Sequence, residues 1–508
     1  MIFVKTNLKP FFSSFMKPIC FSAFVLLYSY AGMAQTTWPS IQQGIKLVGT
    51  GALDTTNQGG AVCISADGNT ALVGGNGDSL NTGAVWAYTR TAGVWSQQGN
   101  KLTGTGATGP ANQGQAVSVS ADGNTAILGG DNDSNEAGAA WIFTRTAGVW
   151  TQQGSKLFGT GAARTAGQGW SVSISSDGNT AVVGGPYDHT AIGAVWVFIR
   201  SGGIWTQQGN KLVGTGHTGS SEQGSSVSIS GDGNTILVGA DGDSSGVGAA
   251  WVFTRSGSVW SQQGSKLTGT GALGTSVQGC AVSLSNDGNT AIVGGNSDNF
   301  GIGAAWVYTR SGGVWTQQGS KLLGTGGNAA QFGNSVSLSG DGNMAVIGGN
   351  TDNSGTGAVW VFTRSTGVWT QQGSKLTGTG SGGAAYQGSA VALSADGTTA
   401  IVGGNQDNVI KGASWIFVSA ATAGITEYGK LNQQLTAFPN PNTGIFILHA
   451  EREGTYTLLN TSGQELRTLK LNTGNNYTIQ IDGLEAGLYF IRGINEQEVT
   501  RVKVVVVK

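Results

Sequence analysis

Six residues with aromatic or charged side chains interrupt an otherwise repeated sequence, and they are the first candidates for chemistry. They are Arg164, Trp170, Tyr187, His189, His217 and Glu222. Trp170 is the only one of 15 Trp residues that lies outside two regularly spaced rows. Aromatic and Arg side chains dominate the energetically important contacts of binding sites. The cluster therefore predicts a binding surface for a glycan or a protein, and neutral drift on solvated loops is the alternative.

Residue types suited to catalysis are scarce. The chain has only 3 His residues, and it contains no nucleophile elbow, His-Glu zinc motif or phosphate-binding loop. Acidic pairs do occur, but they recur from repeat to repeat, which is typical of structural residues. We therefore expect a protein that is not an enzyme.

A long internal repeat positions these residues. An Asp-Gly step recurs seven times at a period of 55 or 54 residues, at Asp67, Asp122, Asp177, Asp232, Asp287, Asp341 and Asp396. In the unit 287–341 four segments have the alternation and flanking Gly and Asn turns of antiparallel strands: Thr290–Gly295, Ala304–Arg310, Val314–Leu322 and Ser335–Ser339. Four strands repeated seven times predict an all-β fold, a seven-bladed β-propeller. The repeats of a β-helix are far shorter than this period.

The Trp rows indicate how the propeller closes. One row, from Trp86 to Trp415, marks the third strand of all seven repeats. A second row, from Trp95 to Trp369, marks the fourth strand but has only six members, and the seventh Trp of this kind is Trp38, ahead of the first repeat. The chain pattern stops at Phe417 without a fourth strand. We therefore expect the segment Trp38–Thr50 to complete the last blade, a strand exchange that removes the open edge. We expect both Trp rows to pack between blades; sugar-binding platforms are the alternative.

Composition limits the partners. The net charge is -1 and charged residues make up only 10% of the chain, which gives no reason to expect a nucleic acid or an anionic membrane as partner. Beyond the leader the chain keeps Cys63 and Cys280, which fall in different repeats at different strand positions. We expect two buried free thiols rather than a disulfide.

Residues 1–34 have the features of a secretory signal peptide. Lys5, Lys9 and Lys17 precede the apolar run Cys20–Tyr30, which is too short to span a bilayer, and small residues precede a cleavage before Gln35. An uncleaved anchor and a start at Met16 are the alternatives. The predicted organisation is a signal peptide (1–34), the propeller (35–418), a polar linker (419–434) and a second domain (435–508). The mature form is expected to have no transmembrane segment.

The repeat SVSLSxDGNTAIVGGNxDN…GAAWVFTRSGGVWTQQGxKL resembles the bacterial FG-GAP type, akin to the propeller of integrin α subunits, and is also similar to the kelch repeat. The integrin-like family often carries calcium in a D-x-D-x-D-G loop. The loops here hold only one or two carboxylates, fewer than the six to eight oxygens that Ca²⁺ prefers, and Asp and Asn commonly cap turns instead. Calcium is thus the one candidate cofactor, with Asp131, Asp133, Asp241 and Asp243 as candidate ligands.

The C-terminal segment has a different pattern. Short alternating strands separated by Asn-Pro, Ser-Gly and Ala-Gly turns predict a small Ig-like β-sandwich over residues 435–508. Pro439-Asn440-Pro441, Gly463, Leu484–Tyr489 and the Val-rich end together resemble the C-terminal sorting domain of type IX secretion substrates. That resemblance implies the type IX machinery as a partner, and a secreted or outer-membrane cell-surface location. An ordinary Ig-like module is the alternative.

These features together predict an exported propeller that acts as a binding or adhesion module for a glycan or protein. Near-identical blades with short loops favour this over a propeller-scaffold enzyme acting on extracellular carbohydrate, because an active site usually breaks the symmetry of one face. A surface or spacer protein without a ligand is the third alternative.

Overall fold

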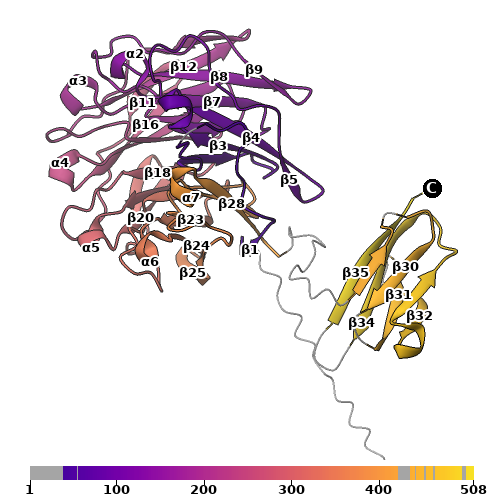
Figure 1. Ribbon diagram of the computed structural model, residues 1–508. Coiled ribbons are helices and arrows are strands. Elements are labelled where there is room, and N and C mark those ends of the chain that lie inside the picture. Colours follow the sequence, from indigo (N-terminus) through magenta and orange to yellow (C-terminus); the bar gives the residue numbers. More distant parts are fainter. Residues whose placement is uncertain are drawn as a thin grey trace, which may run out of the picture.

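The computed structural model describes residues 38–53, 55–420, 435–440, 442–450, 453–460, 464–494 and 499–507. The predicted signal peptide and most of the predicted linker lie outside these residues. The described chain contains seven consecutive four-stranded antiparallel sheets, each one blade of a β-propeller, followed by a separate C-terminal pair of sheets. The predicted fold class is confirmed (Figure 1).

Each blade runs from an inner to an outer strand. The innermost strands are β2 (Ala61–Ile64), β6 (Ala116–Val119), β10 (Ser171–Ile174), β14 (Ser226–Ile229), β18 (Ala281–Leu284), β22 (Ser335–Leu338) and β26 (Ala390–Leu393). The second strands are β3 (Thr70–Gly75), β7 (Thr125–Gly130), β11 (Thr180–Gly185), β15 (Thr235–Ala240), β19 (Thr290–Gly295), β23 (Met344–Gly349) and β27 (Thr399–Gly404). The third strands are β4 (Ala84–Thr91), β8 (Ala139–Thr146), β12 (Ala194–Ser201), β16 (Ala249–Ser256), β20 (Ala304–Ser311), β24 (Ala358–Ser365) and β28 (Ala413–Val418).

The outermost strands are β5 (Val94–Gln97), β9 (Val149–Gln152), β13 (Ile204–Gln207), β17 (Val259–Gln262), β21 (Val314–Gln317), β25 (Val368–Leu376) and, in blade 7, β1 (Ile41–Gln42). One-turn segments join the second and third strands: α1 (Asp78–Asn81), α2 (Asp133–Glu136), α3 (Asp188–Ala191), α4 (Asp243–Gly246), α5 (Asp298–Gly301), α6 (Asp352–Gly355) and α7 (Asp407–Ile410). The outermost strand of blade 5 is shorter than the predicted Val314–Leu322. It ends at Gln317, and Leu322 rejoins Ala305 only as an isolated bridge, whereas the same sequence in blade 6 forms the longer strand β25.

The N-terminal segment closes the ring as predicted. Ile41 pairs with Val418 and Gln42 with Phe417, so β1 supplies the fourth strand of blade 7. Leu47 continues this pairing, and its amide donates to the Ser414 carbonyl at 2.7 Å. The same segment reaches blade 1, because the Gln43 Oε1 accepts from the Trp95 indole at 3.0 Å. The exchanged strand therefore binds both sides of the closing seam.

A circle of backbone hydrogen bonds joins the Asp-Gly turns of all seven blades. In each turn one amide donates to the carbonyl of the equivalent residue one blade on, at 2.8–3.1 Å, and Ala395 of the last blade donates to Ala66 of the first. Within each turn the Asp carboxylate is also satisfied locally. The Ser65 hydroxyl and the Asn69 amide both donate to Asp67 Oδ1, at 2.5 and 2.9 Å. The turn sequence thus both shapes the hairpin and links it to its neighbours.

The two Trp rows pack as structural residues. Trp141, on the third strand of blade 2, is 0% exposed, and its indole N–H donates to the Thr105 carbonyl at 2.9 Å. Gly104 is required beside it, since a Cβ there would lie 2.1 Å from the indole. On the fourth strand Trp150 lies under the Arg145 guanidinium, 5.2 Å from the ring centroid. Burial of a whole indole contributes about 4–6 kcal/mol.

The C-terminal domain is a small sandwich. One sheet contains β29 (Leu435–Phe438), β30 (Phe446–Ala450) and β33 (Thr478–Ile481), and the other contains β32 (Glu465–Leu471), β31 (Gly454–Leu459), β34 (Gly487–Ile494) and β35 (Val499–Val506). A short 3-10 turn, η1 (Thr473–Asn475), precedes β33. Phe446, Leu458 and Ile491, all 0% exposed, come from both sheets and form part of one core. The predicted β-sandwich is confirmed.

Candidate functional site

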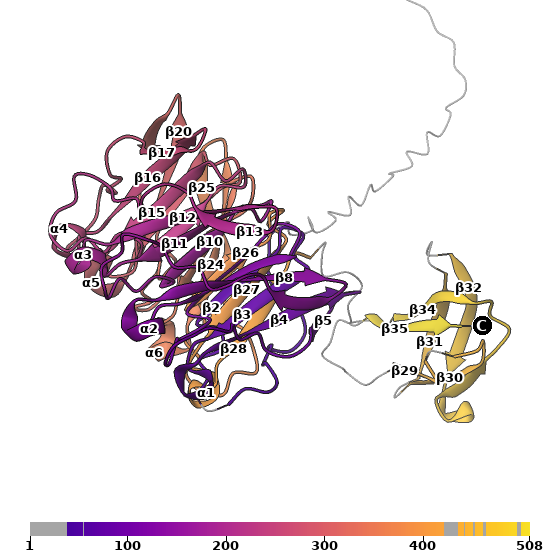
Figure 2. The ribbon, with the colours of Figure 1, turned by 90° about the horizontal axis from the view of Figure 1, so that it is seen from above.

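The strand order gives the propeller two different faces. The Asp-Gly turns and the turns between third and fourth strands lie on one face, which we call the turn face. The one-turn segments α1–α7 and the connections between blades lie on the other, the loop face, and Figures 1 and 2 show α2 to α6 gathered on one side of the ring. The candidate residues all belong to the loop face. The chain enters at Trp38 and leaves at Val418 on the turn face, because β28 runs away from α7.

Seven buried aspartates organise the loop face. Asp78 begins α1 with 0% exposure, and its carboxylate accepts the Leu53 amide at 2.7 Å and forms an ion pair with Lys101. The following residues Ser79 and Leu80 adopt left-handed backbone angles (φ 52° and 55°). The same ion pair and amide bond recur in every blade, so this aspartate row holds the loops in place.

The calcium candidates are split between this framework and a second row. Asp133 and Asp243 belong to the buried row and are already ion-paired with Lys156 and Lys266. Asp131 is contacted by the Asn112 amide at 3.4 Å, and Asp241 Oδ1 is buried without a hydrogen-bond partner among the described residues. In the part of the chain that the structure describes, no three His, Cys, Asp or Glu side chains lie close enough to hold a metal. The geometry thus adds no support to calcium binding, which stays a prediction.

Trp170 and Tyr187 meet as the predicted patch requires. Their ring centroids lie 5.4 Å apart at an interplanar angle of 77°, an edge-to-face contact. Trp170 directly precedes the inner strand β10, and Tyr187 directly precedes α3 of the same blade. Tyr187 rests on Gly167, where a Cβ would lie 3.0 Å from its ring, and 41% of Tyr187 is exposed. The pair is therefore an accessible aromatic surface on blade 3.

Glu222 borders this pair from the next blade. Its amide donates to the Ala191 carbonyl at the end of α3 (2.9 Å), and its side chain lies over Gly242, where an added Cβ would lie 3.2 Å from Cγ. Burial raises the pKa of Glu222, and the neighbouring Asp241 raises it further. Glu222 is thus held beside a second carboxylate rather than beside a cation.

The other predicted residues are placed less closely. Arg164 and His189 are exposed, and their side chains form no ion pair or hydrogen bond with any described residue. His217 is partly buried on the connection to blade 4, and its Nδ1 has no partner within the described chain. The structure therefore brings together Trp170, Tyr187 and Glu222, and shows no contact that joins the remaining three to them.

Three acidic residues complete the surroundings of Tyr187, and sequence reasoning did not place them there. Burial raises the pKa of the Tyr187 hydroxyl, and the charges of Glu222, Asp131, Asp241 and Glu136 raise it further, in that order. Burial likewise raises the pKa of Asp131 and of Asp241. Glu136 could have been found from the sequence, because it and Glu222 are the only Glu residues between 35 and 418.

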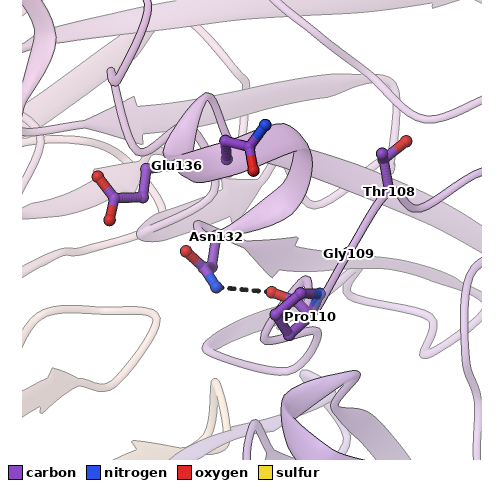
Figure 3. Close-up of a pocket in the computed structure, with 6 residues that line it drawn as sticks. Thr108, Gly109, Pro110, Asn132 and Glu136 are labelled. Carbon is purple, nitrogen blue, oxygen red and sulfur yellow. Dashed lines mark hydrogen bonds between the residues drawn. The ribbon is translucent and has the colours of Figure 1, made fainter.

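A shallow depression of about 340 Å³ adjoins this region on blade 2. It is lined by Thr108, Gly109, Pro110, Asn132, Asn135 and Glu136. Figure 3 shows Glu136 on one side and Thr108 on the other, with the Asn132 amide donating to the Pro110 carbonyl at 2.7 Å. The Glu136 carbonyl accepts from the Gly167 amide at 2.9 Å. The depression and the aromatic pair therefore share one stretch of the loop face.

Comparison with known proteins identifies the C-terminal domain. Residues 436–508 match the family described as "Secretion system C-terminal sorting domain", which confirms the predicted sorting domain. Such a tail marks a protein that is exported and then attached to the cell surface or secreted. No curated protein matches the chain. No described helix is long and apolar enough to cross a membrane.

Several solved structures are similar to this chain at low identity. Hydrazine synthase of Kuenenia stuttgartiensis is 13% identical over 70% of this chain and 95% of its own, with a TM-score of 0.44. The periplasmic gluconolactonase of Pseudomonas aeruginosa is 14% identical over 78% of this chain and 92% of its own, with a TM-score of 0.42. These likenesses are too distant to carry a functional argument. The assignment of the propeller fold depends on the strand pairing of this chain.

Proposed function

We propose that the propeller of this exported protein is a binding module that captures a glycan or protein ligand on its loop face, without catalysing a reaction. One observation carries the proposal: the accessible Trp170–Tyr187 pair interrupts a ring whose other Trp residues all serve packing. Aromatic side chains with exposed faces bind both sugars and protein side chains.

The course of the chain supports the choice of face. The polypeptide leaves the propeller on the turn face, and the sorting domain lies further along the same chain. A tether on the turn face leaves the loop face free for a ligand. The same topology suits either a surface-attached or a released protein.

The absence of catalytic function is part of the proposal. The ionisable residues whose charges act on Tyr187 are all carboxylates, and no described His side chain forms an ion pair with them. Two carboxyl groups act as acid and base in glycoside hydrolysis only where they flank the scissile bond of a bound substrate. The shallow form of the site favours surface contact over enclosure of a substrate.

The test compares capture by three forms of the full mature protein on a glycan array and on intact cells. Trp170→Ala with Tyr187→Ala should abolish capture and leave the melting temperature nearly unchanged. Phe300→Ala is the matched control, because Phe300 is an aromatic residue on the same face with 100% exposure but lies on α5 in blade 5. Unaltered capture by the folded double variant would contradict the proposal.

A further inference from the structure

The carboxylates of the propeller divide into a periodic set and a small aperiodic set. Fourteen aspartates fall in the two rows already described, one in each Asp-Gly turn and one at the start of each one-turn segment. The aperiodic carboxylates among the described residues 38–53 and 55–418 are Asp131, Glu136, Glu222 and Asp241. All four lie on blades 2 to 4, and their charges raise the pKa of the Tyr187 hydroxyl. We call these four residues, with Trp170 and Tyr187, the acidic arc.

The cations of the propeller are nearly all engaged elsewhere. Each Lys of the periodic row is ion-paired to a buried Asp, and each Arg of the periodic row lies over an outer Trp or bonds the Asn of an Asp-Gly turn. The aperiodic cations are Arg164 and Lys411, and Lys411 belongs to blade 7. The acidic arc therefore has four carboxylates and one exposed guanidinium in its neighbourhood.

The aromatic pair is set between carboxylates from both neighbouring blades. On one side, the Gly167 amide donates to the backbone carbonyl of Glu136, which joins the loop carrying Glu136 to the residue beneath the Tyr187 ring. On the other side, the backbone amide of Glu222 donates to the Ala191 carbonyl, which joins the loop carrying Glu222 to the end of α3. A π-face with anions on two sides attracts an organic cation, because the ring quadrupole and the carboxylates act in the same direction.

We infer that the acidic arc binds the ammonium or guanidinium group of a Lys or Arg side chain on a protein partner, seated on the Trp170–Tyr187 pair between Glu136 and Glu222. This inference rests on the proposed function and narrows its ligand from a glycan or protein to a basic protein segment. Charge complementarity is the argument for that partner: the hydroxyl groups of a neutral glycan can donate hydrogen bonds to carboxylates, but only a cationic segment also neutralises the charge of four of them. A bare metal ion is a poorer fit, since no described trio of donors converges here.

The experiment measures binding of a fluorescein-labelled octa-arginine peptide and an octa-lysine peptide to the mature protein by fluorescence anisotropy, at low ionic strength and at about 0.15 M salt. An octa-glutamate peptide is the negative probe. The affinity for the basic peptides should fall about tenfold or more in Glu136→Gln with Glu222→Gln, and at least as far in Trp170→Ala with Tyr187→Ala.

The matched control changes charge equally on the other face. Asp232→Asn with Asp396→Asn removes two carboxylates from the Asp-Gly turns and should leave the affinity within about twofold, because charges separated by more than a Debye length are screened. An equal loss in this control would overturn the inference in favour of general electrostatics. A melting curve for each variant confirms that it is folded.

The outcomes distinguish failure of this inference from failure of the proposed function. If the protein binds neutral or amino-sugar oligosaccharides through Trp170 and Tyr187 but neither basic peptide, the protein partner is wrong and the binding function stands. If it binds no glycan, no peptide and no cell surface, both fall. Binding of free arginine amide as tightly as the peptides would also overturn the protein partner, since a small cation would then suffice.

Discussion

The Asp-Gly turns on the turn face and the acidic arc on the loop face belong to the same sevenfold ring but hold their carboxylates in opposite ways. On the turn face, partial burial acts to raise the pKa of Asp232, yet hydrogen bonds from Ser230 and Asn234 and the charge of Arg310 bring it below its ordinary value. In the acidic arc burial raises the pKa of Asp241, whose Oδ1 has no hydrogen-bond partner among the described residues. The anionic form of Asp232 therefore stabilises the fold, whereas the anionic form of Asp241 destabilises it.

This contrast separates framework from function within one chain. A carboxylate that recurs in every blade, and whose hydrogen bonds are satisfied by its neighbours, is accounted for by its contribution to the stability of the fold. A carboxylate that occurs once, and that its surroundings disfavour, needs another explanation, since perturbed ionisable groups gather at functional sites. The four predictions below test this division, from the largest expected effect to the smallest.

Removal of the closing strand should have the largest effect. Deletion of residues 38–50 removes β1, the Leu47 bonds to Ser414, the Lys46 partner of Asp407 and the Gln43 acceptor of Trp95. Blade 7 then has an open edge and a buried carboxylate without its cation, so we expect a fall in melting temperature of about 10 °C or more, or aggregation. Differential scanning calorimetry and light scattering measure both. A truncated protein as stable and monomeric as the full one would refute the strand exchange.

The Trp residues offer the second comparison. Trp141→Ala should cost about 3–5 kcal/mol, because the indole is 0% exposed and leaves a cavity between blades 1 and 2. Trp170→Ala should cost about 1 kcal/mol or less, since Trp170 is only partly buried and stands outside the packed rows. Denaturant unfolding of the two variants measures the difference. Similar costs would mean that Trp170 belongs to the framework after all.

Much of this division could be predicted from the sequence, because a repeat shows what every blade must keep. The blade number, the strand exchange and the two Trp rows follow from spacing alone. The contact of Trp170 with Tyr187 also follows, since both lie on connections that meet at the loop face. The end of the outer strand could not be foreseen: the same sequence, VWTQQGSKL, stops pairing regularly at Gln317 in blade 5 and continues to Leu376 in blade 6.

The acidic arc is harder to predict from the sequence than the propeller. Asp131 and Asp133 are two residues apart and suggested shared ligation, but Asp133 pairs with Lys156, 23 residues away, while Asp131 contacts Asn112. Sequence spacing does not show which way adjacent loop side chains point. The regular recurrence of acidic loops masks Glu136, although its residue type alone sets it apart.

The third prediction concerns the turn face and has a definite pH dependence. Asp232→Asn should destabilise the protein by about 1 kcal/mol at neutral pH, since the variant loses the charge that accepts from Ser230 and Asn234. Because the folded-state pKa of Asp232 is lowered, its contribution is present above the ordinary pKa and is lost as the pH falls through the folded value. Unfolding curves from pH 7 to pH 2 should therefore converge for the two proteins at the acidic end. A constant difference across that range would show that charge is not the cause.

The smallest effect should have the opposite sign. Asp241→Asn removes a carboxylate whose folded-state pKa is raised by burial, so the wild-type anion weakens the fold above that pKa. We expect the variant to melt about 1–2 °C higher at pH 7, and this advantage should disappear as the pH falls through the raised pKa, where the wild-type carboxyl group also becomes neutral. Asp232→Asn is its matched control, with the same chemical change and the opposite shift. The opposite result would be a loss of stability at pH 7, as expected for Asp232→Asn. It would mean that the Asp241 carboxylate stabilises the fold, and it would contradict a separate role for the acidic arc. A gain in stability together with weaker binding of the basic peptides would be the signature of a carboxylate that is kept for its ligand.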